Sequence, residues 1–212
     1  MNSAITTIFE AFEWFMRLVR LNLVFLLACV SGLVLFSFFP AITASFAVAD
    51  KWIKGNTDLS VWKEFWKNFK ESYIRSQVVG FLMGIAILII VVDLNFFSQI
   101  DVLLMKVPVM ILLGLLLIVI TITGLYIFPI LLKSEVKVKE LFITAFFTSL
   151  SYIHWTVINL TGIAGLLYVS YRFPGTLFFL TGSCIILWIA CMNQIVRNKI
   201  NRRYEKLKSV AE

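Results

Sequence analysis

The one histidine of the chain, His154, is the side chain best suited to acid–base chemistry near neutral pH. It lies near the middle of a long apolar stretch, residues 141–171, and Ser151, Thr161 and Gly165 fall on the same helical face. An ionisable group at that depth in a membrane suggests a proton relay or a ligand contact. The alternative is a neutral imidazole that hydrogen-bonds a neighbouring helix, and the sequence shows no acidic partner at the same depth.

Other patterns with chemical potential are few. Asp93, Asn95 and Asp101 cluster beside Lys106, where they could hold an external ion or sugar or simply stay hydrated at the membrane surface. The three cysteines lie inside apolar runs without CxxC or histidine pairing, which argues against a disulfide framework or a zinc site. The chain has no phosphate-binding loop, nucleophile elbow, HExxH motif or acid–base pair of carboxylates. We therefore expect no catalytic, cofactor-binding or metal-binding residue.

The stretch "VWKEFWKNFKESYIRS", residues 61–76, combines aromatic and charged side chains at helical spacing. Its five aromatic residues fall within an arc of about 100°, with the charged residues on the far side. The pattern predicts an amphipathic helix over 61–75 whose aromatic face contacts lipid headgroups, the protein's own bundle or a groove on a partner. The face consists of Trp62, Phe65, Trp66, Phe69 and Tyr73.

Directly after this stretch, Ser76, Gly80 and Gly84 form a stripe of small residues at intervals of four. Such a stripe lets two helix backbones approach closely in a membrane. We expect it to be a helix-packing face, and the neighbouring helix could belong to the same chain or to a partner.

The composition identifies the environment in which these elements must work. Of the 212 residues, 60% are hydrophobic and only 15% are charged, with a mean hydropathy of +0.94. Soluble domains average about 25% charged residues, so the composition indicates a membrane protein. The formal net charge of +7 is explained by basic loops between apolar runs, and no nucleic-acid partner is expected.

Five stretches are long and apolar enough to cross a bilayer, which requires about 20 residues each. We predict a single all-α membrane domain over residues 1–212, because backbone groups in lipid must be hydrogen-bonded within the segment. The first 20 residues lack a cleavable signal and are expected to form an amphipathic helix leading into the membrane. The expected spans are 21–40, 77–97, 107–132, 141–171 and 173–196, followed by a basic tail, 197–212.

The orientation follows from the distribution of Lys and Arg on the two sides. With five crossings, one side holds six in 41–76, three in 133–140 and six in 197–208, fifteen in all. The other side holds four, namely Arg17, Arg20, Lys106 and Arg172. The positive-inside rule therefore predicts a multi-pass cell-membrane protein with an external N-terminus and a cytoplasmic C-terminus.

The segments 17–80 and 124–147 resemble the YesL-like family of small bacterial membrane proteins. The similarity includes Asn22-Leu23 at the opening of the first span, Pro40 followed by Thr43-Ala44, and a Phe-Trp-x-x-Phe-Lys segment at residues 65–70. The resemblance implies a polytopic membrane protein whose genes commonly lie beside carbohydrate ABC importers. The family has no agreed biochemical activity, so it supplies no catalytic residue.

These observations lead to a hypothesis and an alternative. The first is a non-enzymatic accessory membrane protein of carbohydrate uptake that contacts the lipid bilayer and the permease subunits of an ABC importer. The importer is included only because the family resemblance implies it. The alternative is a small-solute transporter or channel, alone or as an oligomer. A membrane enzyme using His154 is a third class. The sugar, the partner and the oligomeric state stay open at this point.

Overall fold

The computed structural model describes residues 2–99, 102–132 and 136–211. Within these ranges the chain is built of helices joined by short turns, and no strand is present. The helices are α1 (Asn2–Ser31), α2 (Phe38–Ile53), α3 (Val61–Ser98), α4 (Leu103–Leu131), α5 (Val138–Ser151), α6 (Ile153–Arg172) and α7 (Gly182–Ala211), and a short π-helical turn, η1 (Leu177–Thr181), precedes α7.

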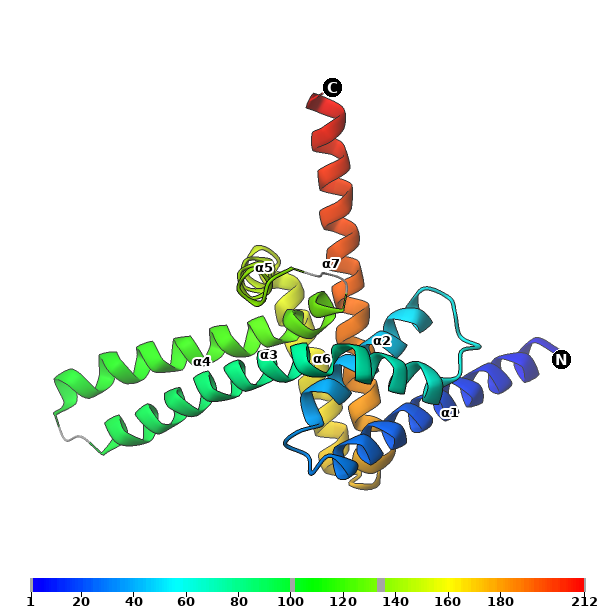
Figure 1. Cartoon of the computed structure of the whole chain (residues 1–212), viewed down its shortest axis with the longest axis horizontal. Helices are drawn as coiled ribbons and strands as arrows, with labels where there is room; N and C mark the ends of the chain where they lie inside the picture. Colours follow the sequence, from blue (N-terminus) through cyan, green and yellow to red (C-terminus); the bar gives the residue numbers. More distant parts are fainter. Residues whose placement is uncertain (1, 100–101, 133–135, 212) are drawn as a thin grey trace.

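The short helix α2 lies at the centre of the molecule, where it contacts α1, α3, α4 and α7. Around it, residues 14–31 of α1 and 61–80 of α3 complete a packed region that we call the hub. The rest of α3 runs with α4 away from the hub as a long hairpin, the α3–α4 limb (Figure 1). The C-terminal half of α7 leaves the hub in another direction (Figure 1).

Small side chains explain why α2 can occupy the centre. Ala41, Ala44 and Ala49 are fully buried, as are the hydroxyl-bearing Thr43 and Ser45. Small residues allow neighbouring helices to approach closely, and a hydroxyl inside a helix can return its hydrogen bond to a carbonyl one turn earlier. Ser45 Oγ donates to the Ala41 carbonyl at 2.8 Å in this way. The sequence "FFPAITASFAVAD" is therefore suited to a buried helix.

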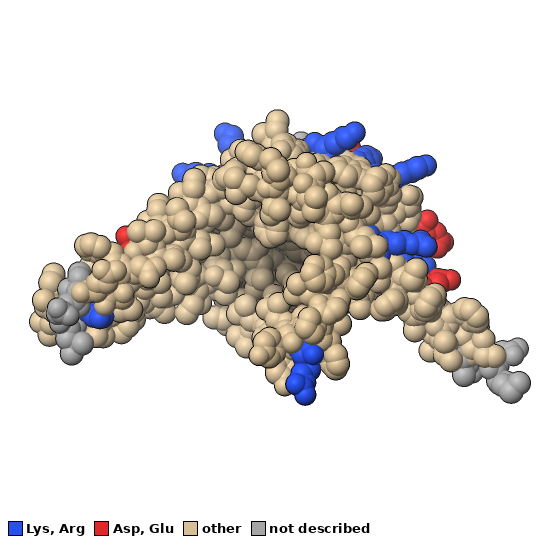
Figure 2. All heavy atoms as spheres, turned by 90° about the horizontal axis from the view of Figure 1, so that it is seen from below, with Lys and Arg blue, Asp and Glu red and all other residues tan. Residues whose placement is uncertain are grey.

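Five helices of the structure are long and apolar enough to cross a membrane, and the fold is all-α and polytopic. They are Ile5–Ser31, Val61–Ser98, Leu104–Leu131, Ile153–Arg172 and Leu177–Ser209. Large apolar side chains are exposed along them, for example Leu88 at 63% and Ile118 at 57%. In Figure 2 the middle of one face carries no charged residue, and the Lys, Arg, Asp and Glu side chains lie at its margins and projecting ends. This surface is typical of contact with lipid or with other membrane helices.

Two expected spans are wrong in their boundaries. The first, 21–40, is not one helix: α1 ends at Ser31, the chain turns, and α2 begins at Phe38. Leu33 and Val34 in this turn have φ of 53° and 58°, the left-handed region that ends a helix. Pro40 lies in the first turn of α2, where its missing N–H is not needed.

The expected span 141–171 is also divided. The chain breaks at Tyr152, with φ −117° and ψ 41°, so that α5 and α6 are separate helices and only α6 is a candidate span. By contrast, the expected helix 61–75 and span 77–97 form one uninterrupted helix, α3. The basic tail likewise continues α7 as far as Ala211.

Candidate functional site

The aromatic face of α3 lies mainly inside the hub. Phe65 is fully buried and Phe69 is 8% exposed, both against apolar residues of α1 and α2 such as Leu21 and Val48. The Phe65 and Phe69 rings stack with centroids 6.0 Å apart, and the Trp66 ring lies 5.1 Å from that of Phe69. Of the three environments that the sequence left open for this face, the structure shows the protein's own bundle.

The outer edge of this aromatic face is more accessible. Trp62 is 53% exposed, while Trp66 and Tyr73 are half-buried. The Trp62 ring contacts the Trp66 ring at a centroid distance of 5.8 Å. Only this edge can reach lipid or a partner without unpacking the hub.

The small-residue stripe on α3 divides at its middle. Ser76 is fully buried, and a Cβ added to Gly80 would overlap the ring of Phe39 on α2. At Gly84, no described heavy atom outside the adjoining backbone of α3 and the two neighbouring residues lies within 4 Å of such a Cβ. The stripe therefore packs against α2 up to Gly80 and opens onto the limb surface at Gly84.

His154 does not lie in the middle of a span. It is the second residue of α6, directly after the break at Tyr152, and its side chain is exposed. Its ring lies between those of Tyr152 and Trp155, at centroid distances of 6.4 and 5.7 Å. Within the described part of the chain, no hydrogen bond or ion pair of the imidazole is found, so the expected contact with a neighbouring helix is absent there.

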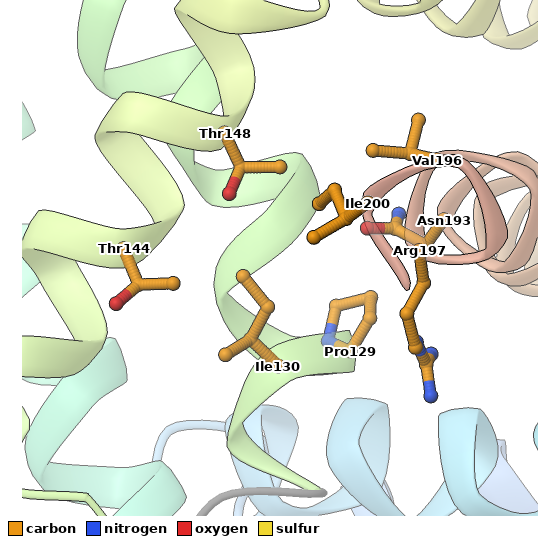
Figure 3. A pocket seen from close by; sticks show the side chains of 8 residues that line it. All are labelled: Pro129, Ile130, Thr144, Thr148, Asn193, Val196, Arg197 and Ile200. Carbon is orange, nitrogen blue, oxygen red and sulfur yellow. The ribbon is translucent and has the colours of Figure 1, made fainter. Parts of the chain in front are cut away.

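A cleft opens where the end of α4, α5 and α7 meet (Figure 3). Its volume is about 210 Å³, and eight residues line it: Pro129, Ile130, Thr144, Thr148, Asn193, Val196, Arg197 and Ile200. The threonines come from α5, while the Arg197 side chain points away from them and away from α7 (Figure 3). The Arg197 guanidinium lies 3.9 Å from the Asp50 carboxylate on α2. Half of these residues are polar, but most of the surface that they expose to the cleft is apolar, and the one cation already faces a carboxylate.

The polar amide in this cleft serves the backbone. Pro129 has no N–H, so the Leu125 carbonyl one turn earlier loses its helical hydrogen bond. Asn193 of α7 donates from Nδ2 to this carbonyl at 3.2 Å and to the Ile189 carbonyl at 2.9 Å. The side chain thus repairs a gap in the neighbouring helix.

A second buried asparagine does the same for the π-helical turn before α7. A π-turn interrupts the regular hydrogen-bond pattern of an α-helix. Asn22 of α1 donates from Nδ2 to the Phe178 carbonyl at 2.6 Å and accepts the Ser183 N–H at Oδ1 at 3.1 Å. A Cβ at Gly182 would come within 2.5 Å of this oxygen, so the close approach requires glycine there.

A buried threonine hydroxyl bridges the break between α5 and α6. Thr156 Oγ1 lies 3.0 Å from the Ser149 carbonyl on the other side of the break and 2.9 Å from the Tyr126 hydroxyl on α4. Tyr126 and Thr156 are each 1% exposed. Asn193, Tyr126 and Thr156 are not among the residues that the sequence patterns predict to be important. Pro129 could have indicated the role of Asn193, because a proline within an apolar helix leaves a carbonyl that needs another hydrogen-bond donor.

Charged side chains gather at the end of the hub where α2 ends and α3 begins. Lys51 Nζ lies 2.8 Å from Glu64 Oε1, and Lys54 Nζ lies 2.6 Å from Asp50 Oδ2. At the same end, Arg17 Nη2 lies 3.9 Å from Asp58 Oδ1. Among the described residues, no three His, Cys, Asp or Glu side chains are close enough to hold a metal ion. The arrangement is that of a charged rim on an apolar hub.

Comparison with known proteins agrees with the resemblance noted in the sequence. Residues 18–94 match the family described as "Protein of unknown function, DUF624". The chain is 32% identical over 196 residues to the uncharacterized protein YesL of Bacillus subtilis (strain 168), covering 92% of both chains. It is 31% identical over 181 residues to the uncharacterized protein YteU of the same organism, covering 82% of this chain and 77% of that one. No solved structure matches. The chain therefore belongs to the DUF624 family of YesL-like proteins.

Proposed function

We propose that this chain is a non-enzymatic accessory membrane protein that binds the membrane-spanning subunits of a carbohydrate ABC importer. The membrane character rests on the five apolar helices. The choice of an ABC importer as the partner rests on the gene neighbourhood that the family resemblance implies. The experiment described below tests this part of the proposal.

One observation carries the non-enzymatic part of the proposal. Three of the buried polar side chains of the described chain are committed to the backbone: Asn22 to the π-turn, Asn193 to the carbonyl freed by Pro129, and Thr156 to the α5–α6 break. Catalysis requires several polar groups that converge on one reacting atom. These groups instead satisfy carbonyls and N–H groups of neighbouring helices, which supports a role through binding.

The surface supports binding within the membrane. On α3, Leu88, Ile89 and Val92 are 63%, 54% and 57% exposed, and they belong to the limb that projects from the hub. A permease subunit presents transmembrane helices of similar character, and van der Waals packing drives the association of such helices in lipid. We therefore assign the limb as the binding element of the proposal.

The proposed orientation places residues 41–76, 133–140 and 197–208 in the cytoplasm. These regions hold fifteen of the nineteen Lys and Arg residues, which supports this side under the positive-inside rule. Importer subunits that couple to cytoplasmic ATPases would then meet the rim on their inner side.

Affinity purification from the native membrane at endogenous expression tests this function. We expect the permease subunits of a carbohydrate importer to copurify with the tagged chain and not from an untagged strain. Leu88→Trp with Val92→Trp on the limb should remove them while the protein stays monodisperse. Gly84→Ala, which adds one methyl group where no described atom outside the adjoining part of α3 lies within 4 Å, is the control. An intact protein that recovers no permease subunit would refute the proposal.

Asn159 gives the transporter alternative a specific basis. It is fully buried on α6, and neither its Nδ2 nor its Oδ1 has a hydrogen-bond partner in the described ranges. Buried amides are normally paired, so a polar solute passing between α6 and α7 could supply the missing partner. Under this alternative, liposomes containing only this protein would show solute flux, and Asn159→Leu would abolish it.

A further inference from the structure

The contacts of α1 determine the direction in which it runs beside α3. Near the start of α3, Arg17 of α1 pairs with Asp58 at 3.9 Å, and the Trp14 ring lies 6.0 Å from the Trp52 ring. At the other end, Gln77 Nε2 of α3 donates to the Leu35 carbonyl at 3.0 Å, in the turn after α1. Therefore α1 and the first half of α3 run in the same direction, and α2 returns between them.

The turn between α1 and α2 stops well short of the far end of the limb. It lies beside Gln77, and α3 continues for 21 residues to Ser98, about 32 Å of helix at 1.5 Å per residue. If α3 leads from the cytoplasm to the outside, the turn is near the inner side of the bilayer. The N-terminal part of α1 is then farther still from the outside.

The lengths of the helices agree with an incomplete crossing. From Arg17 to Ser31, α1 has 15 residues, about 22 Å of helix, and the 16 residues of α2 span about 24 Å. The hydrocarbon core of a bilayer is about 30 Å thick. The 20 residues of α6 match this thickness at about 30 Å, and the 29 residues of α4 exceed it. As a whole α1 is long enough to cross, but the part of α1 after Arg20, which carries no charge, and the whole of α2 are each shorter than this core.

The turn itself is apolar and outward-facing. Leu33 is 80% exposed, and Val34, Leu35 and Phe36 are 55%, 59% and 51% exposed. A turn in water is normally rich in polar residues, Gly and Pro. Backbone groups in lipid need internal partners, and this turn has them: the Val34 N–H donates to the Cys29 carbonyl at 2.7 Å, and the Phe38 N–H donates to the Val34 carbonyl at 2.9 Å. The turn is thus suited to acyl chains.

The charges agree with this arrangement. The Arg197–Asp50 pair brings the cytoplasmic end of α7 to the end of α2, beside Trp52 and therefore near the N-terminal part of α1. When Arg17 and Arg20 are counted on this side, it holds 17 Lys and Arg residues, and the other side holds only Lys106 and Arg172. The bias of 17 to 2 is stronger than the 15 to 4 obtained with an external N-terminus.

We infer that α1 and α2 form a re-entrant hairpin that enters the membrane from the cytoplasmic face and returns to it, with the turn Gly32–Ser37 among acyl chains of the inner leaflet. Both termini are then cytoplasmic. The external N-terminus expected from the sequence followed from counting 21–40 as one crossing, and α1 and α2 divide that stretch. The first residues of α1 lie along the inner surface, where the exposed Ile8, Phe9 and Phe12 enter the headgroup region.

Cysteine labelling in intact and permeabilised spheroplasts tests the side of each terminus. Single cysteines are placed at exposed positions in a background with Cys29→Ala, Cys184→Ala and Cys191→Ala: Glu10→Cys, Glu205→Cys and, at the α6–α7 turn, Tyr171→Cys. A membrane-impermeant maleimide should label Tyr171→Cys in intact spheroplasts and the other two only after permeabilisation. Labelling of Glu10→Cys from outside, to the same extent as Tyr171→Cys, would overturn the inference.

Two further measurements keep the inference testable if the cysteine-free background fails to fold. Green fluorescent protein matures in the bacterial cytoplasm, so fusions to either terminus of the otherwise unaltered chain should fluoresce equally. A dark N-terminal fusion beside a bright C-terminal one would overturn it. For the turn, a bimane label on Leu33→Cys should be quenched severalfold more by nitroxide-bearing lipids than a label on the exposed Asn56→Cys. Equal quenching would show that the turn lies in water.

Discussion

The α1–α2 and α3–α4 hairpins are both strongly apolar, but they differ in how they are buried and where their charges lie. In α2, ten of the 16 residues are buried, and small side chains hold the neighbouring helices close. Along the limb the large side chains of α3 and α4 face outward, and charged residues lie only near its ends. The first hairpin is therefore part of a packed hub, and the second consists of helices that are long and apolar enough to cross a membrane and that expose large apolar side chains.

The difference shows that hydrophobicity alone does not determine a crossing. Both 21–40 and 77–97 are apolar over the required length, but only the second is continuous helix. What separates them is the left-handed turn at Leu33 and Val34 together with the close packing of α2. Substitutions in the hub should accordingly have larger effects than matched substitutions in the limb or on the outer surface.

The largest expected effect is that of Phe65→Ala. Phe65 is fully buried, and truncating a buried aromatic residue costs about 3–5 kcal/mol. We expect a loss of this size in the free energy of unfolding, measured by SDS titration in mixed micelles. Trp62 precedes Phe65 by three residues on the same face, but it is 53% exposed. Trp62→Ala should therefore lower the free energy of unfolding by less than about 1 kcal/mol. Equal losses would show that the aromatic face is not divided between hub and surface.

Asn22→Leu should have the next largest effect. It leaves the Phe178 carbonyl and the Ser183 N–H without their present partner, at about 1–3 kcal/mol for each buried group. The matched control is Asn95→Leu in the limb, because the Asn95 amide donates only to the Val91 carbonyl of its own helix in the described contacts. The same titration should show a change near zero for the control. A stable Asn22→Leu variant would mean that the π-turn does not need the amide.

Gly80→Leu tests the packing of α2 against α3. The added side chain would meet the ring of Phe39, and overpacking of this kind costs about 1–3 kcal/mol. Gly84→Leu, one turn farther along α3, points to open space among the described atoms and should be tolerated. Thermal stability in mild detergent, followed by size-exclusion chromatography, compares the two. If Gly84→Leu is the more harmful variant, a partner helix covers the limb at that position.

His154→Phe should have the smallest effect. The imidazole is exposed, and its described contacts are tilted ring contacts with Tyr152 and Trp155, which phenylalanine can also make. Protein level and any growth phenotype that depends on this protein should match the wild type, with a change in stability within about 0.5 kcal/mol. A severe growth defect at a normal protein level would revive the ionisable role that the sequence suggests.

Much of the fold could be predicted from the sequence, because long apolar runs in a chain of this composition form helices. The α4 helix was close to its expected ends, since Lys106 and Lys133 bound the apolar run. The turn after Ser31 and the break at Tyr152 were missed for a common reason. Turn residues in lipid or in a packed hub need not be polar, so the composition signal that identifies loops in water is absent there.

Some residues of the candidate site could be predicted from the sequence and others could not. The amphipathic pattern of 61–73 predicted which aromatic side chains share a face, and Phe65 and Phe69 are the buried ones. The partners of Asn22 and Asn193 depend on contacts across 156 and 68 residues of chain. Local spacing carries no information on such distant contacts, although Pro129 does predict that some donor must reach the Leu125 carbonyl.

The comparison between the two hairpins is tested most directly at their tips. Leu33→Cys lies in the turn of the first hairpin, and Val102→Cys lies at the outer end of the second, where the native side chains are 80% and 55% exposed. An impermeant maleimide applied to intact spheroplasts should label Val102→Cys, whereas Leu33→Cys should stay unlabelled even after permeabilisation and react only in detergent. Labelling of both cysteines from outside would contradict the account, because both hairpins would then cross the membrane completely.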